Sequence, residues 1–216
     1  MVNGMRKYWI QNEKSPLPAL AGANFDPDSC DFCRETEFAA IDQYVWQGDY
    51  RCEARAYVTR GADALNVLMC AKEKTIHAEA KRFNDPVCRD SCLEFFLQPV
   101  SGDDRYVNFE VNAAGIALIG IGKGRHGRAL LPALPENMEI QASRHAGEWW
   151  AVRYRVPFTL LKKLFGKLPD ARMRGNFYTC DETIHPHFGT WNPVASDQPD
   201  FHRPECFGEL EFVTGK

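Results

Sequence analysis

Hydrophobic and polar residues alternate with a period of two through most of the chain beyond about residue 38. This period places successive side chains on opposite faces of a β-strand. Strands are predicted at 51–59, 65–69, 91–98, 106–112, 116–121, 139–144, 149–156, 174–180 and 207–213. The segments between them are rich in glycine, aspartate and asparagine, which is typical of turns, and one hairpin turn is predicted around 145–147.

A single helix is predicted at 158–165, a short amphipathic segment followed by Gly166. Residues 1–35 contain Pro16, Pro18 and Pro27 and are expected to form an irregular lead-in. Many short strands with turns between them and one helix favour an all-β fold, an antiparallel β-sandwich, over residues 36–216.

Several predicted strands have one apolar and one polar face. In 106–112 the polar face carries Tyr106, Asn108, Glu110 and Asn112, and in 91–98 Glu94 lies opposite the apolar residues. Arg174, Asn176 and Tyr178 share a face of 174–180, and Arg153 and Arg155 share a face of 149–156. If these strands are neighbours, their side chains suit the paired hydroxyls of a sugar. The alternative is a solvated outer face, with Glu94 paired to Arg153 or Arg174.

The C-terminal region holds Trp191 in a loop punctuated by prolines and a glycine, close to His185, His187 and His202. An indole on a rigid loop indicates stacking on a ligand, while the alternative is a buried corner tryptophan. The spacing of His185 and His187 allows two imidazoles to reach one metal ion, although hydrogen bonding to a ligand or to the loop is the preferred interpretation.

Composition limits the possible partners. The 216 residues carry a net charge of −3, which favours neither nucleic acid nor an anionic membrane, and no protein partner is evident. No apolar run reaches transmembrane length, and no signal peptide is seen, so a cytoplasmic location is expected. The eight cysteines are expected to be mostly buried free thiols, with a zinc or redox role for Cys30 and Cys33 as the alternative.

Three blocks of the sequence together resemble a known family. They are 85–96, with Asp90-Ser91 and Glu94-Phe95-Phe96; 106–115; and the end of the chain, with Trp191-Asn192-Pro193 and Phe207-Gly208-Glu209-Leu210. Arg155-Val156-Pro157-Phe158 before the helix adds to the likeness. The chain resembles the family 9 carbohydrate-binding modules, in particular their stand-alone bacterial branch.

The resemblance implies a sandwich related to the immunoglobulin-like and jelly-roll folds and a carbohydrate ligand. In the family, a sugar lies between two tryptophans, polar side chains hold its hydroxyls, and calcium ions support the loops. By the resemblance, Trp191 and Glu94 match motif residues of the family, and the position of Asn112 suits a hydroxyl partner. The chain departs from the pattern where the second tryptophan is expected, since Phe83 lies there.

The predicted function is non-catalytic binding of a mono- or oligosaccharide by aromatic stacking and hydrogen bonds. The predicted ligand-binding residues are Trp191, Glu94, Asn112, Asn108, Arg174, Tyr178, His185, His187 and Phe83. Two alternatives remain open. One is a glycosidase that uses Glu94 and Glu110, and the other is a haem-binding sandwich with Met69, Met138 or Met173 as an axial ligand. A structural calcium ion is a further possibility, at Asp26 and Asp28 or at Asp103 and Asp104.

Overall fold

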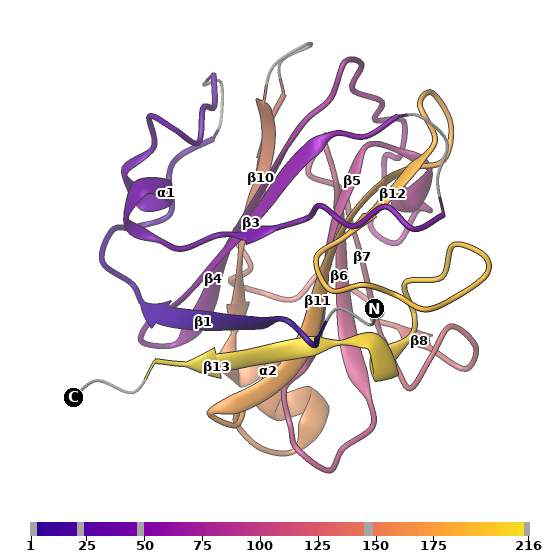
Figure 1. Cartoon of the computed structure of the whole chain (residues 1–216). Helices are drawn as coiled ribbons and strands as arrows, with labels where there is room; N and C mark the ends of the chain where they lie inside the picture. The colour runs from indigo at the N-terminus through magenta and orange to yellow at the C-terminus, as the bar shows by residue number, and fades with distance from the viewer. Residues whose placement is uncertain (1–3, 21–23, 47–49, 145–148, 214–216) are drawn as a thin grey trace.

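The structure is a computed structural model that describes residues 4–20, 24–46, 50–144 and 149–213. Its elements follow one another along the chain as shown in Figure 1. They are β1 (Lys7–Asn12), α1 (Asp31–Glu35), β2 (Ala39–Ala40), β3 (Glu53–Arg60), β4 (Ala64–Lys72), η1 (Val87–Arg89), β5 (Cys92–Gln98), β6 (Tyr106–Asn112), β7 (Ala117–Gly122), β8 (Ala129–Leu130), β9 (Gln141–Ser143), β10 (Trp149–Pro157), α2 (Phe158–Phe165), β11 (Arg172–Asp181), β12 (His187–Thr190), η2 (Pro204–Cys206) and β13 (Gly208–Phe212).

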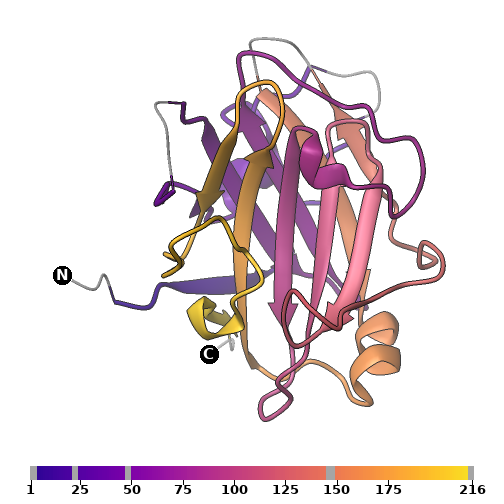
Figure 2. The same ribbon diagram turned by 90° about the vertical axis from the view of Figure 1, so that its right-hand side faces the viewer.

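The strands form one continuous hydrogen-bonded order, β8-β7-β6-β5-β11-β13-β1-β3-β4-β10-β9, with β12 beside β11 and β2 beside β3. This sheet curls over so that its two ends face each other, and Figure 2 shows the two layers. We call β8-β7-β6-β5-β11-β13 with β12 the first half-sheet. We call β3-β4-β10-β9 with β2 the second half-sheet. The inner face of each half-sheet points toward the other.

Strand β1 joins the two half-sheets. Its residues Lys7 to Ile10 pair with β13, and its last two residues pair with β3. Both of these pairings are parallel. The predicted β-sandwich is therefore antiparallel except at β1. Tyr8 and Ile10 of β1 are buried in the core between the half-sheets. The expected irregular lead-in therefore contains the strand that holds the sandwich together.

The main hydrophobic core lies between the inner faces. It combines Phe95, Phe109 and Phe177 of the first half-sheet with Val67 and Tyr154 of the second. Phe95 stacks on Phe177 with their ring centroids 4.8 Å apart. Phe95, Phe109 and Phe177 lie opposite the polar residues that the sequence pattern identified in these strands, because period-two alternation fixes which side chains share a face.

The outer faces are also covered. Leu20, Phe25 and Phe32 from the N-terminal segment pack on Tyr57 and Trp149 of the second half-sheet. Segment 192–207 and η1 cover the first half-sheet, and Figure 2 shows η1 in front of that layer. Strand β4 is consequently buried on both faces except at Lys72. The expected solvated outer face is absent from the middle strands, since neighbouring segments exclude water from them.

The sequence pattern locates most elements closely. The bounds of β6 and α2 agree with the predicted ranges, and Gly166 ends α2 with φ 81°. The pattern missed β1, α1, β2, β8 and β12, each of which has six residues or fewer. The described residues contain two α-helices, α1 and α2, where one was predicted. The hairpin turn predicted around 145–147 lies outside the described residues.

Two glycines allow close approach of β11 to its neighbours. Gly175 pairs with Gly208 of β13 and with Leu97 of β5. A Cβ on Gly175 would lie 2.6 Å from the Phe96 carbonyl oxygen and 2.7 Å from Leu210 Cδ1. We expect Gly175→Ala to lower the free energy of unfolding by about 1–3 kcal/mol, the usual cost of overpacking. Urea titration against wild type tests this, and an unchanged midpoint would contradict the close approach.

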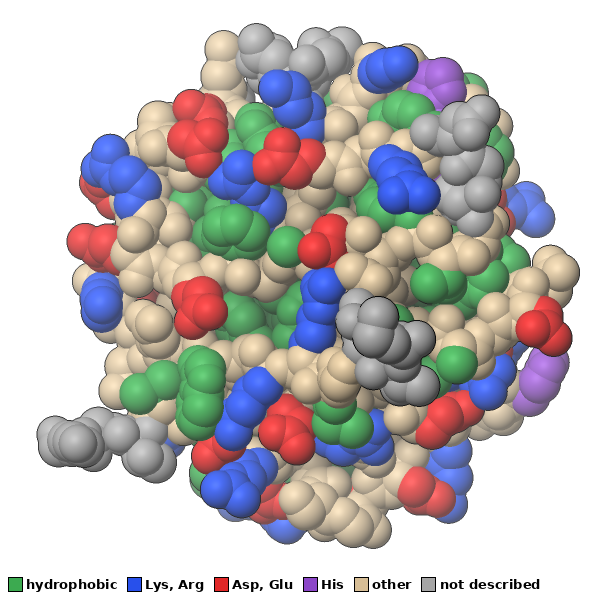
Figure 3. Space-filling model, viewed as in Figure 1, with side chains coloured by type: hydrophobic (Ala, Val, Ile, Leu, Met, Phe, Trp, Pro, Cys, Tyr) green, Lys and Arg blue, Asp and Glu red, His purple; other side chains and the backbone are tan. Residues whose placement is uncertain are grey.

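The surface shows no segregation of charge on the side seen in Figure 3, where basic and acidic side chains are interspersed. Many of them pair locally, such as Arg55 with Glu53 and Lys7 with Glu211. Within the described residues, no helix is long and apolar enough to cross a membrane.

Candidate functional site

The outer face of the first half-sheet carries a row of polar side chains. In β11, β5 and β6 the directly paired positions are Tyr178, Glu94 and Glu110. Directly opposed residues of antiparallel strands share a face, with their Cβ atoms about 4.5–5.5 Å apart. The structure thus brings together the two carboxylates that the sequence analysis named, and it places Asn108 beside them on the same face of β6.

We call Glu94, Glu110, Asn108 and Arg128 the carboxylate cluster. Glu110 accepts hydrogen bonds from Asn108 Nδ2 at 2.9 Å and from Arg128 Nη1 at 3.1 Å. Glu94 has the thiol of Cys180 as its partner, at 3.3 Å. The ion pair of Glu94 with Arg153 or Arg174 is therefore wrong. Arg153 lies in β10 of the second half-sheet, while Arg174 donates to the backbone oxygens of Glu205 and Phe207.

Burial governs the protonation of this cluster. Glu94 is 2% exposed and Glu110 is 4% exposed. Burial, and then the neighbouring Glu110, raise the pKa of Glu94 well above its usual value. Burial likewise raises the pKa of Glu110, although contact with Arg128 opposes that rise. Glu94 therefore favours the protonated form, in which it is able to donate as well as accept hydrogen bonds.

Asn108 has an unsatisfied hydrogen-bond acceptor in this cluster. The side chain is fully buried and its Nδ2 is bound to Glu110, but its Oδ1 has no hydrogen-bond partner within the described part of the chain. An unsatisfied buried acceptor costs about 1–3 kcal/mol. Such a cost is expected where a polar group is reserved for a ligand.

The sequence analysis missed Arg128, which crosses the end of β7. A Cβ on Gly122 would lie 2.9 Å from Arg128 Cα, and one on Gly120 would lie 3.0 Å from Asn108 Oδ1. The glycine-rich end of this strand is the available signal, because glycines at alternate strand positions indicate that another segment passes closely over one face.

Aromatic rings from the C-terminal segment border the carboxylate cluster. Phe201 stacks on Tyr178 with their centroids 4.1 Å apart, and His202 packs on Phe96 at 4.9 Å. The hydroxyl of Tyr106 lies 2.8 Å from His202 Nδ1. Tyr178 was predicted as a ligand contact, but its hydroxyl donates to the Phe201 carbonyl. Phe201 was not predicted, because nothing in its local sequence distinguishes it from a loop-anchoring residue.

Trp191 does not form an exposed platform. It is 4% exposed and belongs to the core between the half-sheets, where it makes edge contacts with Phe177 at 5.6 Å and Tyr8 at 6.5 Å. The buried-corner alternative is correct for this side chain, since β1 and β13 close over the ring. Phe83 packs at the margin of the same core and not on the carboxylate cluster, so the two residues do not form a clamp on that outer face.

Asn112 has a structural task. Its Oδ1 accepts hydrogen bonds from the backbone N–H groups of Ala114 and Ile116, which closes the β6–β7 turn. Its Nδ2 donates to Asp90 Oδ2 at 2.7 Å. The two oxygens of Asp90 also accept from the backbone of Glu79 and Ala80. The predicted role of Asn112 as a hydroxyl partner is therefore replaced by a role in fixing the turn.

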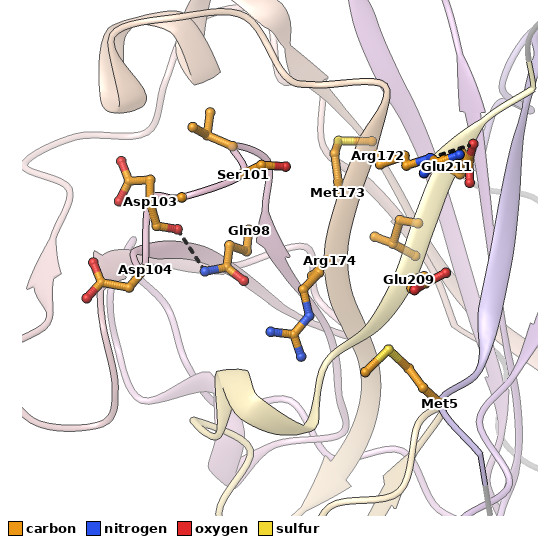
Figure 4. Close-up of a pocket in the computed structure, with 13 residues that line it drawn as sticks. Met5, Gln98, Ser101, Asp103, Asp104, Arg172, Met173, Arg174, Glu209 and Glu211 are labelled. Carbon is orange, nitrogen blue, oxygen red and sulfur yellow. Dashed lines mark hydrogen bonds and ion pairs between the residues drawn. The ribbon is translucent and has the colours of Figure 1, made fainter.

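Arg174 lines a separate groove of about 560 Å³ at the edge of the first half-sheet, shown in Figure 4. Gln98 and the loop with Asp103 and Asp104 form one side, and Met5 lies on the other. Gln98 donates to the Asp103 backbone oxygen at 2.8 Å. Charged side chains line the groove together with apolar ones such as Val100 and Leu210, and none of its lining residues is aromatic.

The two histidines of the C-terminal region do not meet at one metal position. His187 is fully buried on the inner side, while His185 stacks on Tyr50 with their ring centroids 5.0 Å apart. Potential metal-ligand groups among the described residues are Cys52 with Glu73 and His187, and Cys92 with Glu94 and Cys180. His185 belongs to neither group.

The acidic turns do not gather into groups of potential metal ligands within the described ranges. Asp103 pairs with Arg105, and Asp104 pairs with Lys123. Asp26 Oδ1 accepts from the backbone of Asp28, and Asp28 pairs with Arg55. These contacts account for the carboxylates as parts of turns and surface ion pairs.

All eight cysteines are free. Cys30 and Cys33 lie at the start of α1, where a hydrogen bond with Cys33 lowers the pKa of the Cys30 thiol to about 6. Met69 and Met138 are buried in the main core. Their thioethers pack among apolar side chains and do not face an open cleft, so these two methionines give the haem hypothesis no support.

The comparisons agree with the resemblance noted in the sequence. The family model described as carbohydrate-binding family 9 matches residues 27–212. A search of curated proteins returns no match. Among solved structures, a protein from Bacteroides uniformis ATCC 8492 whose proposed role is carbohydrate binding is 26% identical, with a TM-score of 0.78; the match covers 97% of this chain and 100% of that one.

Two further structures show the same fold. Both are family 9 carbohydrate-binding modules from Caldicellulosiruptor kristjanssonii, one in complex with cellotriose and one with glucose. They are 12% and 13% identical to this chain, each with a TM-score of 0.62, and each match covers 98% of this chain and 95% or 97% of theirs. The match of the family model to nearly the whole described chain shows that the protein belongs to carbohydrate-binding family 9.

Proposed function

We propose that the protein binds a carbohydrate without cleaving it, and that the carboxylate cluster contacts the sugar hydroxyls. The observation that carries this proposal is the row of Glu94 and Glu110 beside the open acceptor Asn108 Oδ1. Carboxyl, amide and guanidinium groups together offer donors and acceptors at the spacing of neighbouring hydroxyls. Membership in the family and the sugar complexes of its relatives support the class of ligand.

The stacking surface in this proposal is the partly buried ring of Trp46, instead of the buried Trp191. Trp46 packs against Phe201 with their ring centroids 5.9 Å apart, and Phe201 in turn stacks on Tyr178. In this proposal the sugar reaches the carboxylate cluster at Arg128. The Arg128 side chain is 18% exposed, whereas the side chain of its ion-pair partner Glu110 is 5% exposed. Displacing Arg128 from Glu110 opposes binding, so the affinity is expected to be modest.

Calorimetric titration of Glu94→Gln tests the site. We expect the variant to bind cellobiose, xylobiose or glucose at least 10-fold more weakly than wild type, which corresponds to about 1.4 kcal/mol. The physical reason is that the amide keeps the shape of the protonated carboxyl but changes its donor and acceptor pattern. Borohydride-reduced sugars in the same titrations show whether the reducing end is required.

Arg174→Ala is the matched control, since Arg174 lines the separate groove. We expect it to bind sugar as wild type does. Loss of affinity in Arg174→Ala with full affinity in Glu94→Gln would move the site to the groove. An absence of heat with every sugar would contradict the proposed function.

The adjacency of Glu94 and Glu110 also supports a second candidate, glycoside hydrolysis. Retaining glycosidases hold their two carboxyl groups about 5–5.5 Å apart, which is similar to the Cβ spacing of a directly opposed strand pair. In that case the wild type releases reducing sugar from oligosaccharides, and Glu110→Gln abolishes the release. Under our proposal, oligosaccharides bind and remain intact.

A further inference from the structure

Three side chains with metal-binding atoms meet between the half-sheets, apart from the carboxylate cluster. Cys52 precedes β3, Glu73 follows β4, and His187 begins β12. Their ligand atoms all lie within 4.8 Å of one another, and the residues are 6%, 2% and 0% exposed. We call them the thiol–imidazole cluster. They are separated by up to 135 positions in the sequence, so only the tertiary fold brings them together.

The imidazole of His187 is oriented as in a metal site. Its Nδ1 lies 2.8 Å from the backbone oxygen of His185, which makes Nδ1 the protonated donor. The lone pair of Nε2 therefore faces the cluster, 3.6 Å from Cys52 Sγ and 4.0 Å from Glu73 Oε1. A metal-bound histidine typically donates its other N–H to a backbone carbonyl or a carboxylate in this way.

The spacing agrees with tetrahedral coordination. With Zn–S near 2.3 Å and Zn–N near 2.0–2.1 Å, a tetrahedral zinc ion separates sulfur and nitrogen by about 3.6 Å. Cys52 Sγ and His187 Nε2 are 3.6 Å apart. A zinc-bound nitrogen and oxygen lie about 3.3 Å apart, compared with 4.0 Å between His187 Nε2 and Glu73 Oε1. The carboxylate therefore needs to move by less than 1 Å.

Glu73 is held in place by two outer partners. Ser91 Oγ donates to Oε2 at 2.6 Å, and Trp150 Nε1 donates to Oε1 at 3.0 Å. Among the described residues, its one potential ion-pair partner is His187. Burying a carboxylate costs free energy unless the group is paired or coordinates a metal. A bound cation would therefore stabilise the buried Glu73 carboxylate.

Asp181 provides an independent indication. It pairs with His187 across β11 and β12, so both side chains point to the same face of the sheet. Its Oδ1 accepts from the backbone N–H groups of Thr183 and Ile184. Its Oδ2 is buried and has no partner within the described part of the chain. An unpaired carboxylate oxygen beside the cluster is expected where a fourth ligand, or the water that it holds, belongs.

We propose that Cys52, Glu73 and His187 bind a divalent transition-metal ion, with zinc as the fitting metal and Asp181 supplying the fourth position directly or through a water. Thiolate and imidazole ligands favour zinc over calcium or magnesium, which take oxygen ligands. The closed surroundings and the protein-derived ligand set are typical of a structural site. The ion ties the start of β3 and the end of β4 to β12, across the two half-sheets.

Cobalt and zinc titration of the chelator-treated full chain tests the proposal. We expect one equivalent of Co²⁺ to give a thiolate-to-cobalt charge-transfer band and tetrahedral visible bands, both removed by Zn²⁺. We also expect Zn²⁺ to raise the melting temperature of the wild type. A wild type that shows neither the cobalt bands nor a zinc-dependent shift would overturn the proposal, and this readout requires no variant.

Variants assign the ligands. We expect Cys52→Ser to remove the charge-transfer band and His187→Gln to weaken metal binding by more than the ~10–100-fold typical of losing an outer partner. Cys70→Ser is the matched control, since Cys70 is also a buried free thiol and lies outside both groups of potential ligands. Loss of the band in Cys92→Ser, with the band kept in Cys52→Ser, would place the metal at the other thiol group and overturn the assignment.

Discussion

Replacing Trp191 by alanine is expected to lower the free energy of unfolding by about 3–5 kcal/mol, the usual cost of removing a buried large aromatic side chain. The indole is 4% exposed and lies edge-on to Phe177 and Tyr8. It also fits against Gly208, where a Cβ would lie 2.5 Å from the ring. Urea titration of wild type and variant measures the change.

Trp46→Ala is the control for this experiment. Trp46 is only partly buried, at the margin of the cluster that covers the first half-sheet. Its indole N–H donates to the Ser196 carbonyl. We expect a smaller loss of stability than for Trp191→Ala. If Trp191→Ala kept its full stability but lost sugar affinity, the ring would be a ligand platform after all and its place in the core would be contradicted.

The second large effect is a pH dependence that comes from His202. Burial, and then the positive charges of Arg128 and Arg125, lower the pKa of His202 to about 2. The ring is neutral in the fold, with Nδ1 near the Tyr106 hydroxyl and its own backbone N–H bound to Asp200. In the unfolded chain a histidine takes up a proton near pH 6.5.

The sign follows from the depressed pKa. The unfolded chain binds the proton of His202 below about pH 6.5 and the folded chain does not, so stability is lost as pH falls. Each pH unit below 6.5 removes about 1.4 kcal/mol. We expect His202 to account for about 2–3 kcal/mol of the stability lost between pH 6.5 and pH 4.5.

Urea titrations between pH 6.5 and pH 4.5 give the free energy of unfolding of wild type and of His202→Phe. The contribution of His202 is the difference between the slopes of these two free energies with pH. We expect the variant to have the shallower slope, although losing the hydrogen bond to Tyr106 shifts its stability at every pH. Tyr106→Phe is the control, because it removes the same hydrogen bond and keeps the buried imidazole. Parallel slopes for wild type and His202→Phe would show that the histidine is not buried in neutral form.

Period-two alternation predicted the middle strands well because it is a local property. Strand β6 occupies its predicted range, and Glu94 and Glu110 lie on the outer faces that the pattern assigned to them. The same reasoning failed for Arg153, since alternation does not reveal that β10 belongs to the other half-sheet. Strand pairing depends on contacts between segments that are distant in the sequence.

Trp191 shows the same limit for aromatic residues. The prolines and glycine around it correctly indicated a turn-rich segment, but an indole on such a segment suits a ligand platform and a buried corner equally well. Which of these forms depends on β1, a strand near the other end of the chain that the pattern missed. Phe201 was overlooked for the related reason that its stacking partner, Tyr178, lies 23 positions away.

The sequence by itself determined the fold, a β-sandwich of the carbohydrate-binding family 9 type. It also determined the range of α2 and the side chains that share a face in each predicted strand. These features follow from backbone geometry and from motifs a few residues long. The tertiary structure decided which faces are covered, that Trp191 belongs to the core, and that Cys52, Glu73 and His187 meet. Burial and ligand geometry are properties of the space between segments, and alternation along one strand carries no information about what packs against it.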